Sequence, residues 1–270
     1  MSTLALTTPR PHPCGPRLIR AEVLKLATRR GLMIASFSVT VGATIATFAI
    51  LAILHATDPA HHKLIGGLSH FDDGIYSLTQ LTTVAAVLLG ATAGAGDLAG
   101  GFFRNLVVTG HPRGSLYAAR IPGGLALLVP LTALAYAITA GLSQLTPGSQ
   151  HTPSTVLLIE AGLWFELYVT VMFLLALGLA SLLGSRATTL GILAALQLLV
   201  TPVVQGLHNP GVGAEAVLGI ALWHLAPKEL LNGAPSGHLG MSLTATVAVI
   251  LAWMWLAVGL GAWRTTTRDA

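Results

Sequence analysis

The chain has 270 residues, of which 53% are hydrophobic and 9% are charged, whereas soluble domains carry charges on about a quarter of their residues. This composition excludes a water-soluble globular domain, and we expect an all-α, polytopic membrane protein. The net charge of +4 does not indicate nucleic-acid binding, because the cations lie in a few flanking segments and not in one basic stripe.

The first 30 residues are polar and precede the first apolar segment. Residues 1–15 hold three prolines and the only cysteine, Cys14, so we expect a disordered cytoplasmic tail without a disulfide. Residues 16–30 predict an amphipathic helix on the inner leaflet, although a simple topogenic charge cluster explains the same residues. Its apolar stripe is Ile19, Val23 and Leu26, and its opposite, polar face is Arg17, Glu22, Lys25 and Arg29.

Six apolar segments are long enough to cross a bilayer, which takes about 20 helical residues because every backbone polar group must be paired inside the hydrocarbon. They are residues 31–54, 75–96, 121–142, 156–183, 188–207 and 241–263. The first has 24 residues, whereas the apolar core of a signal peptide has about 7 to 15, so we expect it to stay uncleaved. Residues 31–270 would thus form one transmembrane domain with six spans.

The loop between the second and third spans, residues 97–120, contains an apolar stretch that is too short to cross a membrane. Residues 101–109 favour a short helix, which must bury Phe102, Phe103 and Leu106 either in lipid headgroups or in the groove of a partner protein. A loop that only joins two spans is the alternative.

Glu160 and Glu166 fall in the fourth apolar segment, where acidic side chains are costly and therefore candidates for function. If the span begins at residue 156, Glu166 lies about 15 Å along it. The alternative, which we favour, is an outer interfacial helix over 155–166 followed by a span from residue 167, because this placement avoids burying both carboxylates. Glutamines in the spans are expected to form interhelical hydrogen bonds: Gln80, Gln197 and Gln205.

The loop before the last span contains an apolar run, residues 216–226, with Trp223 inside it. Its 11 residues are too short to span, so we expect a re-entrant or interfacial helix that Pro227 ends. Eight of the ten histidines fall on this outer side, but their spacing is not that of a metal site, and we expect no metal.

Charge sets the expected orientation. The cations Lys63 and Lys228 lie in the outer loops, and the other 12 of the 14 lie in the tails or inner loops. By the positive-inside rule both termini face the cytoplasm, in the plasma membrane. The inner cations are Arg10, Arg17, Arg20, Lys25, Arg29, Arg30, Arg104, Arg113, Arg120, Arg186, Arg264 and Arg268.

Motifs for nucleotide binding and catalysis are missing from the sequence. No lysine follows a glycine anywhere, so the phosphate-binding loop GxxxxGK[ST] is excluded, and neither HExxH nor GxSxG occurs. The chain is therefore not expected to be an enzyme or to hold a cofactor. Any ATP-driven work must come from another subunit.

Two segments resemble the permease subunit of ABC-2 type exporters. That family has an elbow helix with an acidic residue and a lysine before the first span, matched here by Arg20, Glu22 and Lys25. Its first inner loop is similar to residues 97–120, with Asp97 at the acidic position, which is more often Glu, and Phe102 in place of a Thr. The matching residues of the loop are Asp97, Gly101, Arg104, Pro112, Arg113 and Arg120.

The resemblance implies a division of labour between subunits. Residues 101–109 would be a coupling helix that docks on a separate cytoplasmic ATPase, which binds ATP and Mg. Two six-span subunits, identical or different, would form the export pathway. The residues expected to serve ATPase coupling are Asp97, Gly101, Phe102, Phe103, Arg104, Leu106, Pro112 and Arg113.

Two other functions remain open from the residues alone. One is a self-contained, proton-coupled secondary transporter that uses Glu160 or Glu166, although the chain shows no internal repeat of the kind such carriers often have. The other is a membrane scaffold with no transport role. The substrate is not indicated by any motif.

Overall fold

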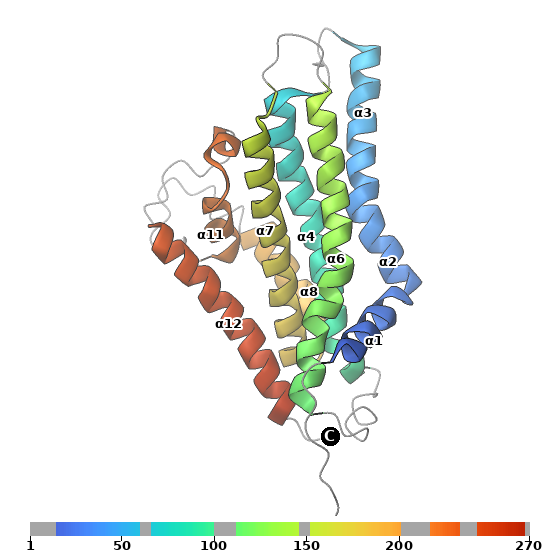
Figure 1. Cartoon of the computed structure of the whole chain (residues 1–270), viewed down its shortest axis with the longest axis vertical. Coiled ribbons are helices and arrows are strands. Elements are labelled where there is room, and N and C mark those ends of the chain that lie inside the picture. The colour runs from blue at the N-terminus through green and yellow to red at the C-terminus, as the bar shows by residue number, and fades with distance from the viewer. Residues whose placement is uncertain are drawn as a thin grey trace, which may run out of the picture.

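The computed structural model describes residues 15–59, 66–99, 112–145, 152–200, 217–232 and 242–267. Throughout these ranges the regular structure is helical (Figure 1). Five helices are long and apolar enough to cross a membrane, which confirms the all-α membrane class. They are Arg30–Thr57, Gly67–Gly96, Arg113–Gln144, Thr155–Leu183 and Leu243–Thr267.

The segment expected to be the fifth of six spans, residues 188–207, is described only in part. It begins as α8 (Arg186–Ala195) and continues as the π-helix η2 (Leu196–Val200). Residues 201–207 lie outside the described ranges, so the six-span topology stays a prediction.

One helix separates the tail from the first long span. α1 (Pro16–Ala27) starts with proline at its first position. Proline lacks a backbone N–H, which costs nothing here because the first N–H groups of a helix have no intrahelical acceptor. α2 (Arg30–Phe37), the π-helix η1 (Ser38–Gly42) and α3 (Ala43–Thr57) then follow one another without a break, with a bend between α2 and α3, and α1 lies at an angle to α2 (Figure 1).

Two helices are longer than the apolar segments that predicted them. α4 (Gly67–Ala99) and α6 (Arg113–Gln144) each begin eight residues before the expected starts at 75 and 121. Phe71 and Tyr117 are buried in these extra turns, so packing continues the helices beyond the stretch that composition marks as membrane-spanning. Asp72, which precedes the apolar segment 75–96, is therefore part of α4.

α7 (Thr155–Leu183) lies at the centre of the bundle, between α4, α6 and α12 (Leu243–Thr267) (Figure 1). The residues at its two ends determine where the helix starts and stops. The Ser154 hydroxyl accepts a hydrogen bond from the Leu157 N–H (3.1 Å) at the start, and Gly184, at φ 73°, ends the helix in the left-handed conformation. The chain then reverses into α8, which Ser185 caps through the Thr188 N–H (3.3 Å).

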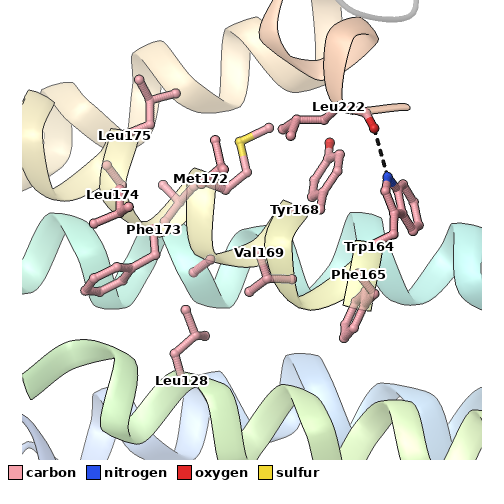
Figure 2. Packing of buried hydrophobic residues seen from close by; sticks show 14 of the residues in the cluster. Leu128, Trp164, Phe165, Tyr168, Val169, Met172, Phe173, Leu174, Leu175 and Leu222 are labelled. Carbon is pink, nitrogen blue, oxygen red and sulfur yellow. Dashed lines mark hydrogen bonds between the residues drawn. The ribbon is translucent and has the colours of Figure 1, made fainter. Parts of the chain in front are cut away.

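The core is built around the inward-facing side chains of α7 (Figure 2). Phe165 and Phe173 are fully buried, and Leu128 of α6 faces the same interior. The short helix α11 (Leu218–His224) closes one side, where the Trp164 indole N–H donates to the Leu222 carbonyl (2.8 Å). A short helix thus forms where residues 216–226 predicted one, and most of its side chains are buried.

Glycines let the central helices approach closely. A Cβ added to Gly90 of α4 would lie 2.5 Å from the Phe173 carbonyl oxygen, and one on Gly94 would lie 2.9 Å from the Ala180 Cβ. A Cβ on Gly261 of α12 would lie 2.8 Å from the carbonyl oxygen of Gly178 on α7. Between membrane helices, where the hydrophobic effect does not drive association, such close packing supplies much of the attraction.

Candidate functional site

The end of the bundle that carries α1 brings together the elements on either side of the predicted coupling segment (Figure 1). α4 ends here at Ala99, α6 begins at Arg113, and α12 ends at Thr267. We refer to it as the α1 end. The coupling residues Gly101, Phe102, Phe103, Arg104 and Leu106 lie outside the described residues, and Asp97 falls in the last turn of α4.

Arg120 is the most deeply placed cation at the α1 end. It is 1% exposed, and its Nη1 donates a hydrogen bond to the Gly94 carbonyl oxygen of α4 (3.0 Å). The Ser181 hydroxyl of α7 donates to the same oxygen (3.3 Å). The expectation that Arg120 is a loop cation is therefore wrong, because α6 begins seven residues earlier and carries Arg120 into the interior. One carbonyl of α4 thus joins three helices.

Two further side chains of α6 reach α12. The Tyr117 hydroxyl donates to the Val258 carbonyl (3.1 Å), and Arg113 Nη1 donates to the Thr266 carbonyl (3.4 Å). Pro112, in an extended conformation, precedes Arg113 and caps the start of the helix. We name Arg113, Tyr117, Arg120 and Ser181 the clasp, since together they link α4, α6, α7 and α12 at the α1 end.

The elbow residues divide between the bundle and the surface. Glu22 is only 9% exposed and packs against α6, where a Cβ on Gly123 would lie 2.7 Å from the Glu22 Cβ. Lys25 forms an ion pair with Glu22 (2.5 Å), whereas Arg20 is exposed. The prediction that Glu22 lies on the exposed, polar face of α1 is wrong. Because Gly123 has no side chain, the face of α1 that carries Glu22 can pack directly on α6.

Glu166 faces α6 about 16 Å along α7 from Thr155, by the helical rise of 1.5 Å per residue. The Thr132 hydroxyl lies 3.0 Å from each of its carboxylate oxygens. Thr132 itself is about 18 Å along α6 from Gln144. α7 runs without a break from Thr155 to Leu183, so residues 155–166 do not form a separate outer helix, and the depth of Glu166 in the membrane stays a prediction. Burying a carboxylate in the middle of a span costs roughly 3 kcal/mol on insertion scales. Glu160 is exposed near the start of α7.

A second cluster of polar side chains, formed by Gln80, Tyr168 and Gln197, lies near α11. Gln197 of the π-helix η2 donates through Nε2 to Gln80 Oε1 of α4 (3.0 Å) and to the Tyr168 hydroxyl of α7 (3.2 Å). The prediction that Gln80 and Gln197 form interhelical hydrogen bonds is confirmed, while Gln205 lies outside the described residues. The π-turn was not predicted, since one extra residue in a turn leaves no compositional signal.

The Tyr168 ring belongs to a group of aromatic side chains that seats α11. Trp223 of α11 lies 4.7 Å from Trp164, 5.4 Å from Tyr76 and 6.3 Å from Tyr168, measured between ring centroids. The sequence marked Trp223 only as part of an apolar run. Its partners come from α4 and α7, which sequence spacing does not bring together.

The described residues hold no group of three or more side chains suited to bind a metal ion. Neither a family model nor a curated protein matches the chain.

Proposed function

We propose that this chain is the membrane-spanning permease subunit of an ATP-driven, ABC-2 type exporter. The observation that carries the proposal is the inner loop: an apolar, helix-compatible segment flanked by Asp97, Arg104, Pro112 and Arg113, in a chain that has no phosphate-binding loop. A separate cytoplasmic ATPase would bind ATP and Mg, and Phe102 and Phe103 would bury their rings in its groove.

The geometry of the α1 end supports this assignment. A displacement of segment 100–111 acts directly on the end of α4 and the start of α6, and the clasp links both of these helices to α7 and α12. A push from the ATPase would therefore move four helices together rather than bend one loop. α1, packed on α6 through Glu22, would follow the same motion.

The proposed assembly contains a second permease subunit, the same chain or another, in the plasma membrane with both termini cytoplasmic. The cations support this orientation. Of the described Lys and Arg side chains, all except Lys228 belong to segments at the α1 end. Anionic headgroups of the inner leaflet would attract this end.

Replacing Phe102 by alanine together with Arg104 by glutamate is expected to lower at least tenfold the recovery of the proposed partner ATPase with the chain. The double change removes one buried ring and reverses one charge of the predicted docking helix. Recovery is measured by affinity purification from detergent-solubilised membranes.

The matched control is Trp263→Ala with Arg264→Glu, which changes an exposed aromatic residue and a cation at the same end of the bundle. It should leave the complex intact. An undiminished complex with the Phe102 and Arg104 changes would refute the docking assignment.

A proton-coupled secondary transporter is the second candidate, because Glu166 sits within a membrane-spanning helix. The two proposals differ in their energy source. Transport by the purified chain in vesicles under a proton gradient, without ATP or ATPase, would favour the second, and its loss in Glu166→Gln would assign the role to Glu166.

A further inference from the structure

Glu166 has few groups that stabilise a negative charge. Its hydrogen-bond donor among the described residues is the Thr132 hydroxyl, whose single proton is also within reach of the Leu128 carbonyl oxygen (3.0 Å). The carboxylate therefore shares one weak donor with the backbone. Charged groups inside a membrane are normally paired, and in the described ranges Glu166 forms no ion pair.

The other described residues do not supply this charge. Lys228 belongs to the 3-10 helix η3 (Lys228–Asn232), and the remaining described Lys and Arg residues belong to segments at the α1 end. Among the described residues Glu166 therefore has no cationic partner, and we look for its counter-charge outside the chain, as a proton or as a bound cation.

The surface beside Glu166 is apolar and open. Leu163, one turn before Glu166 on α7, is 69% exposed, and Val129, one turn before Thr132 on α6, is 37% exposed. Leu167, on the adjoining face of α7, is 44% exposed. A metal ion would need several oxygen ligands, whereas this face offers one carboxylate and one hydroxyl. An apolar body with one positive charge would use both the carboxylate and the surrounding leucines.

We propose that Glu166 binds the positive charge of an organic cation whose apolar groups lie on the α6 and α7 surface formed by Val129, Leu163 and Leu167. This inference rests on the proposed export function and deepens it by naming the substrate class, lipophilic cations. Thr132 holds the carboxylate in place. The apolar surface selects the body of the ligand, and Glu166 selects its charge.

The test is equilibrium binding of tritiated tetraphenylphosphonium to the purified full-length chain in phosphatidylcholine nanodiscs, with binding to empty nanodiscs subtracted. We expect saturable binding that weakens at least tenfold in Glu166→Gln, which removes the charge and keeps the shape. Asp73→Asn, which removes an exposed carboxylate at the same end of the bundle, should stay within twofold of the unchanged protein.

A second measurement needs no variant and so holds even if Glu166→Gln does not fold. Unlabelled tetraphenylphosphonium should displace the tritiated probe at least tenfold more effectively than triphenylphosphine oxide, a neutral molecule with a similar apolar body. Equal displacement by the two compounds would overturn the proposal. So would an absence of saturable binding, or unchanged binding by folded Glu166→Gln.

The assay contains no ATPase, so it separates the two proposals. If the probe fails to bind while the ATPase still co-purifies with the chain, only the substrate class is wrong. If the probe binds but no ATPase associates, the cation site stands and the export mechanism fails.

Discussion

Gly94→Ala is expected to lower the free energy of unfolding by about 1–3 kcal/mol, although alanine is the better helix former by about 1 kcal/mol. The added methyl group would lie 2.9 Å from the Ala180 Cβ and 3.1 Å from the Ser181 backbone nitrogen. Neither neighbour is the flexible end of a side chain, so α4 and α7 would have to separate. The measurement is thermal unfolding of the purified protein in detergent, followed by circular dichroism.

Gly141→Ala is the matched control, because Gly141 lies in α6 and a Cβ there meets no atom within 4 Å. The same substitution should leave the unfolding temperature unchanged or raise it, since only helix propensity acts. If both variants shifted the unfolding temperature upward, the close approach of α4 and α7 at Gly94 would be wrong.

Arg120→Gln is expected to cost about 1.5–3 kcal/mol of stability, the range for a hydrogen bond to a charged group. The glutamine side chain is too short to reproduce the guanidinium contact with the Gly94 carbonyl, which would keep the Ser181 hydroxyl as its side-chain donor. Because segment 100–111 is unchanged, we expect ATPase binding to persist while ATP-driven export falls. Unfolding temperature and export from energised vesicles are the two measurements.

Arg113→Gln serves as the comparison, because Arg113 is half-buried and its contact with the Thr266 carbonyl is long, at 3.4 Å. Its effect on stability should stay within about 0.5 kcal/mol, as for most surface substitutions. Equal losses from the two arginine substitutions would show that burial of Arg120 does not set its contribution.

Hydropathy alone predicted the membrane class and six spans, five of which match helices long and apolar enough to cross, because the requirement for about 20 apolar residues acts on composition. The same signal could not locate the helix ends. Phe71 and Tyr117 lie outside the apolar segments, and what keeps them helical is contact with other helices. Gly184 and Ser185, by contrast, act on their own backbone, so the break that they make between α7 and α8 was visible in the sequence.

The candidate site was only partly predictable. Sequence patterns predict that charged residues face water. Glu22 was therefore expected on the exposed face of α1, and Arg120 was expected in the loop before the third apolar segment. Both are buried by features of a distant helix: Gly123 makes room for Glu22, and the Gly94 carbonyl accepts from Arg120. The hydrogen bond between Gln80 and Gln197 was predicted correctly, because a side-chain amide in an apolar span has few hydrogen-bond partners other than another polar side chain.

The packing of α1 on α6 has a consequence for biosynthesis. Gly123 is added to the chain 101 residues after Glu22, which at about 5–20 residues per second means a delay of roughly 5–20 seconds. During that interval Glu22 has no helix to pack against, and α1 is a charged segment that waits at the membrane surface while the first spans insert. α1 therefore reaches its final position only after α6 has been made.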